Sequence, residues 1–192
     1  MENEEKYKKE KVNIDLYWAN VFAIILLIPT VLIYGLPYYL IWKDTIHFKD
    51  FSLPHFFGSS WGFIIVMIIG IIVHELIHGA VWAIFAKNGF KSIKFGIIWK
   101  MITPYCHCKE PLRVRQYALG GIMPAIVLGL IPAIWAIIMG NIGLLVLGMF
   151  FTVAAGGDFL IIYALRKEKK DTLIEDHPSE VGYFAYRLNG EE

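Results

Sequence analysis

Four long apolar runs limit the fold of this chain more than any other feature. They occupy residues 17–42, 59–86, 117–139 and 142–165 of the 192. A helix needs about 20 apolar residues to cross the roughly 30 Å hydrocarbon core of a bilayer, and each run reaches that length. Only 18% of the residues are charged, against about 25% in soluble domains. The sequence therefore predicts an all-α membrane protein with four transmembrane helices.

Prolines lie inside two of these runs: Pro29, Pro37, Pro124 and Pro132. Each removes a backbone N–H from the helical ladder, yet membrane helices tolerate proline because neighbouring groups satisfy the freed carbonyls. We expect kinks at these positions rather than breaks.

The distribution of Lys and Arg predicts the orientation in the membrane. The N-terminal tail holds four of these residues, the three connections between the apolar runs hold two, seven and none, and the C-terminal tail holds five. The positive-inside rule then places both termini in the cytoplasm. We expect one multi-pass domain of the cell membrane over residues 1–192, with a cytoplasmic tail at 166–192 and no cleaved signal peptide. The net charge of +1 gives no reason to expect a nucleic-acid partner.

The second connection, residues 90–112, carries a strand pattern. In residues 92–102 the side chains of Ile93, Phe95 and Ile97 alternate with more polar positions. This period of two predicts a strand, and the following "TPYCHCKEP" supplies a turn and material for a second strand. We predict a small β-hairpin at the cytoplasmic face, with a plain amphipathic interfacial loop as the alternative.

Ionisable residues inside the apolar runs mark the candidate site. Residues 59–86 contain His74, Glu75 and His78, and residues 142–165 contain Asp158. A charge at the centre of a spanning helix costs roughly 2.5–3.5 kcal/mol, so such residues are rare and functional. In the pattern His-Glu-x-x-His the two imidazoles are one turn apart on one helix face and can bind one metal ion. Glu75 then lies beside the ion and can activate a zinc-bound water.

A catalytic zinc site needs a third protein ligand, and depth in the membrane favours Asp158. His78 lies nine residues before Lys87 and Asp158 eight before Arg166, which places them roughly 13 and 12 Å from the same boundary. The other candidates are His107, Cys106, Cys108, Glu110 and His177, with His107 next in order. The two cysteines are more simply interpreted as reduced thiols, and His177 as part of a solvated tail.

Small residues around the candidate ligands suggest how the two helices meet. The stretch "AAGG", residues 154–157, precedes Asp158, and Gly70 and Gly79 flank the histidines. Small residues allow membrane helices to approach closely. We expect these positions to bring the helix of Asp158 against that of the histidines.

The ordered set of motifs resembles a known family. "HELIHG", "CKEPLRVRQYALGGIMP", "GGDFLIIYALRK" and "DHPSEVGYF" are similar to the bacterial putative zincin peptidase domain family over most of residues 60–184. The pattern also resembles site-2 proteases, although their aspartate lies in an Asn/Pro-rich stretch that ends Leu-Asp-Gly. The resemblance implies a Zn²⁺ site with His74, His78 and Asp158 as ligands and Glu75 as the catalytic carboxylate.

These observations lead to one main functional hypothesis and two alternatives. The main one is a zinc-dependent intramembrane metallopeptidase that hydrolyses membrane protein or peptide substrates. The first alternative is a non-catalytic membrane metal-binding or scaffold protein that retains the site. A small transporter is the weaker alternative, because one polar cluster provides little for a translocation path.

Overall fold

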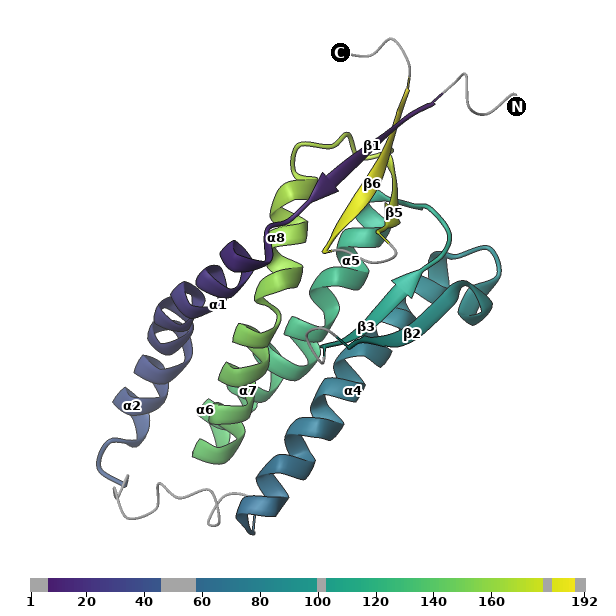
Figure 1. Cartoon of the computed structure of the whole chain (residues 1–192). Helices are drawn as coiled ribbons and strands as arrows, with labels where there is room; N and C mark the ends of the chain where they lie inside the picture. Colours follow the sequence, from purple (N-terminus) through teal and green to yellow (C-terminus); the bar gives the residue numbers. More distant parts are fainter. Residues whose placement is uncertain (1–6, 46–57, 100–102, 178–180, 189–192) are drawn as a thin grey trace. The chain divides into compact units, whose positions relative to one another are not determined.

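The computed structural model describes residues 7–45, 58–99, 103–177 and 181–188 (Figure 1). The chain forms two compact units, each built from segments that are distant in sequence. The first comprises Met1–Ala19, Glu75–Met123 and Gly157–Glu192, and the second comprises Asn20–His74 and Pro124–Gly156. Each unit is described separately below.

The apolar runs form helices that continue through their prolines. In chain order these are α1 (Leu16–Thr30), the π-helix η1 (Val31–Gly35), α2 (Leu36–Trp42), α4 (Ser60–Phe85), α5 (Val114–Pro124), the π-helix η4 (Ala125–Leu130), α6 (Ile131–Met139), α7 (Ile142–Ala154) and α8 (Gly156–Leu165). Within the described residues, three stretches are long and apolar enough to cross a membrane, namely Tyr17–Trp42, Trp61–Phe85 and Val114–Met139. A fourth exists if α7 and α8, which are interrupted at Ala155, count as one span.

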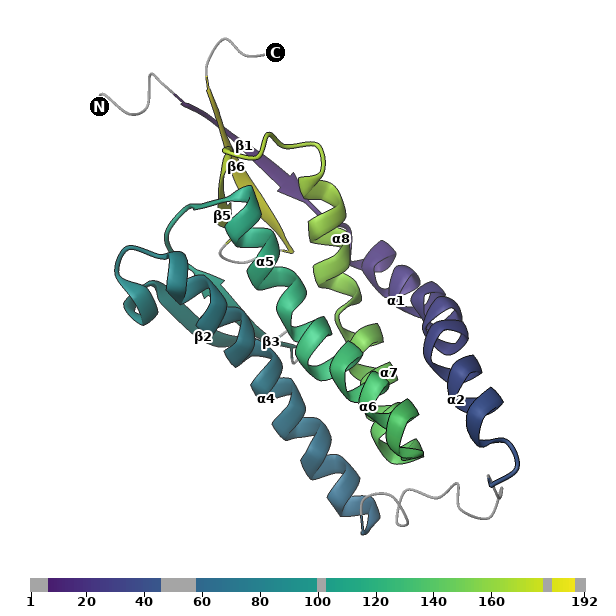
Figure 2. The same ribbon diagram turned by 180° about the vertical axis from the view of Figure 1, so that it is seen from behind.

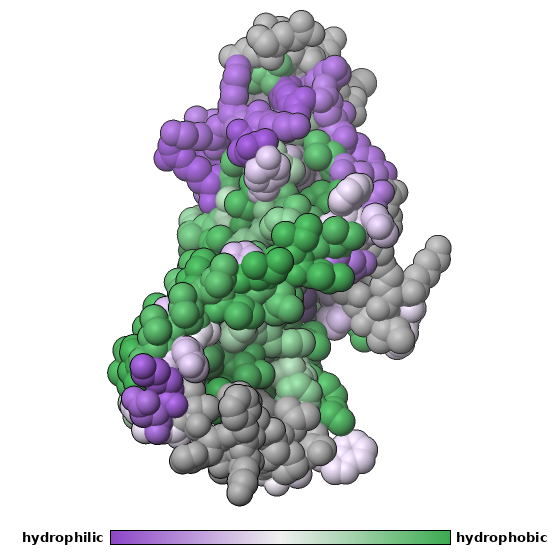
Figure 3. Space-filling model, turned by 90° about the vertical axis from the view of Figure 1, so that its left-hand side faces the viewer, coloured by the Kyte–Doolittle hydropathy of each residue, from purple (hydrophilic) through white to green (hydrophobic). Residues whose placement is uncertain are grey.

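The helices carry the apolar surface expected for contact with lipid. On α1, the side chains of Ile24 and Ile28 are 71% and 65% exposed. Hydrophobic residues predominate over the helices on the face that Figure 3 shows. Large exposed apolar surfaces of this kind mark interaction with a membrane or another protein. Together with helices that are long and apolar enough to span a bilayer, this surface is consistent with a membrane protein.

The second unit is an apolar helical assembly. Its core contains the buried side chains of Tyr34, Tyr38, Ala133, Ala136 and Leu145. The turn between α6 and α7 uses Gly140 in the left-handed conformation, with φ of 69°, and Asn141 as the cap of α7. The Asn141 side chain accepts a hydrogen bond from the Leu144 N–H. Tyr38 donates to the Gly140 carbonyl at 2.8 Å, which attaches α2 to this turn.

The first unit contains two antiparallel sheets. Four strands pair in the order β1-β6-β5-β4, and β2 pairs with β3 (Figure 2). The strands are β1 (Tyr7–Asn13), β2 (Ile93–Ile98), β3 (Thr103–Cys108), β4 (Leu112–Arg113), β5 (Leu173–Asp176) and β6 (Gly182–Leu188), and the 3-10 helix η3 (Gly89–Ser92) precedes β2. Along β1 and β6, Tyr7 is opposite Leu188 and Asn13 is opposite Gly182. The segment before α1 is thus paired with the segment after α8.

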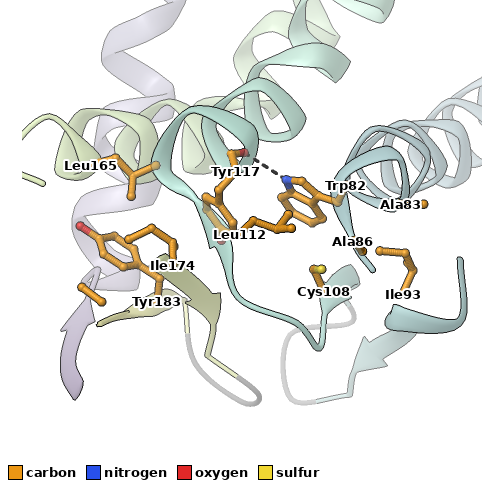
Figure 4. Close-up of a cluster of buried hydrophobic side chains, with 11 residues drawn as sticks. Trp82, Ala83, Ala86, Ile93, Cys108, Leu112, Tyr117, Leu165, Ile174 and Tyr183 are labelled. Carbon is orange, nitrogen blue, oxygen red and sulfur yellow. Dashed lines mark hydrogen bonds between the residues drawn. The ribbon is translucent and has the colours of Figure 1, made fainter. Parts of the chain in front are cut away.

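The core of the first unit joins the four-stranded sheet to its helices. Figure 4 shows this cluster, in which Trp82 from α4 and Tyr117 from α5 lie together. Ile174 from β5 and Tyr183 from β6 are 0% and 1% exposed. Both views of the chain show α5 and α8 side by side, and a Cβ on Gly121 would lie 3.6 Å from Ile162. This core holds the end of α4 that carries Glu75 and His78.

Two expectations from the sequence require correction. The protein is not all-α, because the N-terminal segment and the tail form strands β1, β5 and β6. The tail is also not simply solvated, since Asp176 and Tyr183 are buried. Charged residues obscured these strands: Glu10 pairs with Arg187, and Lys9 with Glu175, so their charges are partly satisfied within the sheet.

Candidate metal centre

A single helix positions three of the four predicted site residues. Helix α4 runs without interruption from Ser60 to Phe85 and carries His74, Glu75 and His78. His74 and His78 are four residues apart, so the helix places them one turn apart on the same face. The side chain of His78 is 5% exposed, whereas His74 and Glu75 are partly buried.

The fourth residue, Asp158, lies in the first turn of α8. Its Oδ1 is 3.4 Å from Nε2 of His78. One ligand atom from each of His74, His78 and Asp158 lies within 4.8 Å of the other two. The structure thus brings together the three side chains predicted as metal ligands.

A backbone carbonyl fixes the orientation of the His78 ring. Nδ1 of His78 is 2.8 Å from the Gly120 oxygen, which only accepts, so Nδ1 carries the proton and donates it. In an α-helix this carbonyl would accept from the N–H four residues later, but that residue is Pro124 and has none. The proline therefore leaves the Gly120 carbonyl available for the histidine. Metal-binding histidines commonly donate their second N–H in this way.

This arrangement fits a bound cation. With the proton on Nδ1, a neutral His78 directs the lone pair of Nε2 toward the Asp158 carboxylate at 3.4 Å. Two acceptors at this separation repel each other unless a proton or a cation lies between them. Two imidazoles and one carboxylate also form a ligand set that catalytic zinc sites use.

Helices α4 and α5 meet closely beside the site. A Cβ on Gly120 would clash with the indole of Trp82, so only glycine allows this approach. The Trp82 Nε1–H donates to the Tyr117 carbonyl at 3.0 Å, as Figure 4 shows. The Trp82 ring also stacks on His78, with centroids 5.1 Å apart. The indole therefore packs directly against a candidate ligand.

The prediction for the small residues holds at Gly70, where a Cβ would clash with the Phe151 ring of α7 in the same apolar run as Asp158. It is wrong at Gly156, Gly157 and Gly79. A Cβ on Gly157 would meet nothing within 4 Å, and one on Gly156 would lie 3.1 Å from Ala23 of α1. A Cβ on Gly79 would contact Phe95 and Cys106 of the β2–β3 hairpin. These three glycines serve other contacts, and beside the candidate ligands themselves the close approach is made at Gly120.

Glu75 lies near the β2–β3 hairpin. The hairpin packs on α4 at Gly79, one turn after Glu75, through Phe95 and Cys106. Burial raises the pKa of the Cys106 thiol, and the negative charge of Glu75 raises it further. The thiol therefore stays protonated at neutral pH.

The structure gives the other candidate ligands different surroundings. Nδ1 of His107 is 3.8 Å from Oδ2 of Asp176, and the ring of His177 lies against Phe184 with centroids 4.8 Å apart. Glu110 accepts hydrogen bonds from Asn88 and Ser92, which lower its pKa. Among the described residues, the one cluster of three candidate ligands is that of His74, His78 and Asp158.

Comparison with protein families supports a metallopeptidase. A family profile described as "Putative zincin peptidase" matches residues 65–173, more than half of the chain. The chain belongs to this family. The match includes all four predicted site residues and implies zinc as the metal. No curated protein and no solved structure matched the chain.

Sequence reasoning missed several residues that surround this candidate site. Gly120, Trp82 and Tyr117 were not selected, and Asp176, which is buried, was assigned to a solvated tail. Two signals were present in the sequence: Trp82 lies one turn after His78, and Pro124 lies four residues after Gly120. Both signals become informative only once α5 is known to face α4.

Proposed function

We propose that the protein is a zinc-dependent intramembrane metallopeptidase, similar in strategy to site-2 proteases, that hydrolyses membrane-associated protein substrates. The cluster of His74, His78 and Asp158 carries this proposal, because its ligand atoms lie within 4.8 Å of one another. The membership of the zincin peptidase family supports the same class of reaction.

The chain's own residues have separate roles in the proposed reaction. His74, His78 and Asp158 would hold the ion, and the Gly120 carbonyl keeps His78 in the tautomer with the proton on Nδ1 and the lone pair on Nε2. A bound zinc ion supplies Lewis acidity, which lowers the pKa of water to about 7 and polarises a carbonyl. Glu75 accepts a proton from the attacking water and passes it to the leaving amine.

An apolar pocket is an argument for a hydrophobic substrate. Its volume is about 240 Å³, and Val66, Gly70 and Val73 of α4 line it together with residues of η4, α6 and α7. Val73 directly precedes His74, so the pocket and the first ligand are adjacent on one helix. A pocket of this kind accepts an apolar side chain, as an intramembrane substrate would provide.

The hairpin offers a way to hold an unwound peptide. Strand β2 pairs with β3 in a two-stranded sheet, so β2 has a second edge outside that sheet. An extended peptide can add to such an edge through main-chain hydrogen bonds. We propose that substrate binds there after unwinding, since a helix keeps its carbonyls within its own ladder.

We further propose four spans with both termini in the cytoplasm. Strands β1 and β6 pair along seven positions, from Tyr7 with Leu188 to Asn13 with Gly182. Paired strands lie on one side of a membrane, so the chain between them crosses an even number of times. This supports four spans over three, and the excess of Lys and Arg in these segments supports the cytoplasmic side.

Glu75→Gln tests the catalytic proposal. The amide keeps the size of the side chain but cannot accept a proton, so hydrolysis should cease while zinc remains bound. We would express wild type and variant in the same host, compare new peptide ends in the membrane fraction by mass spectrometry, and measure zinc in the purified proteins. His177→Ala, whose ring lies against Phe184, is the matched histidine control.

The outcome separates the enzyme from a metal-binding scaffold. Peptide ends that disappear with Glu75→Gln, and persist with His177→Ala, support the peptidase. Identical peptide ends in wild type and Glu75→Gln contradict it. A cellular phenotype that survives Glu75→Gln but not His78→Ala identifies the protein as a scaffold that needs its metal.

A further inference from the structure

A column of three buried rings leads away from the metal centre. The rings of His78 and Trp82 stack with centroids 5.1 Å apart and an interplanar angle of 17°. Trp82 and Tyr117 continue the stack at 5.2 Å and 18°. The three residues are 4%, 5% and 2% exposed, so the column has little free space in which to shift.

The far end of this column is attached to a buried carboxylate. The Tyr117 hydroxyl donates to Oδ1 of Asp176, the last residue of β5. Oδ2 of Asp176 accepts the backbone N–H of Cys108 at 2.8 Å, and Nδ1 of His107 is 3.8 Å away. Asp176 therefore connects β5, β3 and α5 at a single point.

We propose that Asp176 is a positioning residue for the metal ligand His78 and acts through Tyr117 and Trp82. The inference rests on the metal site of the proposed function. Asp176 fixes the Tyr117 hydroxyl, the Tyr117 ring and carbonyl hold the Trp82 indole, and the indole supports one face of the His78 ring. Asp176 lies beyond residues 65–173, which the family profile matches.

The choice of residue favours positioning over simple packing. A buried carboxylate is costly to desolvate, and a neutral side chain of similar volume would fill the same space at lower cost. The carboxylate instead provides two acceptors for two donors on different elements, whereas an asparagine provides one acceptor oxygen. The same α5 also holds His78 directly, through the Gly120 carbonyl one turn after Tyr117. A shift of α5 relative to β5 would thus move both the Gly120 carbonyl and the Tyr117 ring, which together hold His78 in place.

Metal affinity and Co²⁺ spectra test this role without relying on catalysis. All proteins would carry Glu75→Gln, and Zn²⁺ affinity would be measured by competition with a chelator. We expect Asp176→Asn and Tyr117→Phe each to weaken binding by about tenfold, as outer partners of metal ligands do. Both variants should also change the Co²⁺ absorption bands, which report on ligand geometry and which a purely structural role would leave unchanged.

The double variant and a matched control make the test specific. If both residues act through one column, Asp176→Asn with Tyr117→Phe should weaken binding no more than either change alone. Tyr183→Phe removes a hydroxyl from the same core outside the column and should leave affinity and spectrum unchanged. If Asp176→Asn does not fold, Tyr117→Phe decides the question, because it preserves the ring and the carboxylate.

Several results would overturn the inference. These are affinities within twofold of the Glu75→Gln parent, unchanged Co²⁺ spectra, or strictly additive effects in the double variant. A parent protein that binds no metal overturns the inference together with the site. Metal binding without any cleavage by the wild type contradicts only the peptidase proposal and leaves the positioning role standing.

Discussion

Two close helix contacts in this protein use glycine in the same way but differ in function. Where α4 meets α5, Gly120 admits the Trp82 indole, and its carbonyl accepts from His78. Where α6 meets α7, a Cβ on Gly148 would clash with the backbone of Gly129 and Ala133. The residue four positions after Gly120 is a proline, whereas the one after Gly129 is Ala133, which keeps its N–H. The contact at Gly148 is close packing and only stabilises the fold. At Gly120 the following proline leaves the carbonyl without a helical donor, so this contact can also orient the ligand His78.

Among changes at these helix contacts, Gly120→Ala should weaken metal binding the most. The added methyl group displaces Trp82 and the neighbouring His78, so we expect zinc affinity to fall by 10- to 100-fold. Chelator competition on the purified protein measures this loss. Gly121→Ala is the control on the same helix, because its Cβ meets Ile162 at an ordinary 3.6 Å. Equal affinities for Gly120→Ala and Gly121→Ala would show that the α4–α5 contact does not orient the ligand.

Gly148→Ala should affect stability but not the metal. Overpacking against backbone atoms costs about 1–3 kcal/mol, and thermal unfolding in detergent should show a lower midpoint. Gly35→Ala serves as the control, since its Cβ meets only the Val31 side chain at 3.6 Å. Zinc affinity of the folded Gly148→Ala protein should equal that of wild type. A parallel loss of zinc would remove the distinction between the two contacts.

Pro124→Ala tests the freed carbonyl with a smaller expected effect. Alanine restores an N–H that competes with His78 for the Gly120 oxygen, so zinc affinity should fall by up to about tenfold. Pro132→Ala is the control, because it restores an N–H opposite the carbonyl of Leu128, a residue that lines the apolar pocket. That variant should bind zinc as wild type does. Tighter binding by Pro124→Ala would contradict the proposed role of the proline.

The smallest effect concerns the pH dependence of stability at Asp176. Burial raises the pKa of this carboxyl to about 6, although hydrogen bonds from Tyr117 and Cys108 oppose the rise. A carboxyl whose pKa is higher in the folded state stabilises the fold when protonated, and this contribution is lost as pH rises through 6. The unfolding midpoint of the metal-free wild type, relative to Asp176→Asn, should therefore fall between about pH 4 and pH 6 and level off above pH 6. A difference that stays constant over this range would contradict the raised pKa.

The sequence predicted the elements more successfully than the contacts between them. The long apolar runs located the helices, and the alternation of apolar and polar residues located β2, because both signals are local. Strand β1 was missed because Lys8, Lys9 and Lys11 dominate it and its partner β6 lies at the other end of the chain.

Candidate site residues could be predicted where their spacing on one helix, or their expected depth in the membrane, was enough to place them. His74, Glu75 and His78 follow from helical spacing, and Asp158 from its distance to the boundary. The supports at Gly120 and Asp176 were not predictable, because they depend on which helix faces α4 and on how the tail folds back.

Zinc content of the wild type and of Asp158→Ala tests the central claim most directly. The wild type should contain about one zinc ion per chain, held by three protein ligands. Asp158→Ala removes the one ligand that does not come from α4 and should lose most of its zinc. Asp171→Ala, which removes an 89% exposed carboxylate, should keep it. Full zinc content in Asp158→Ala would contradict the account of the metal centre.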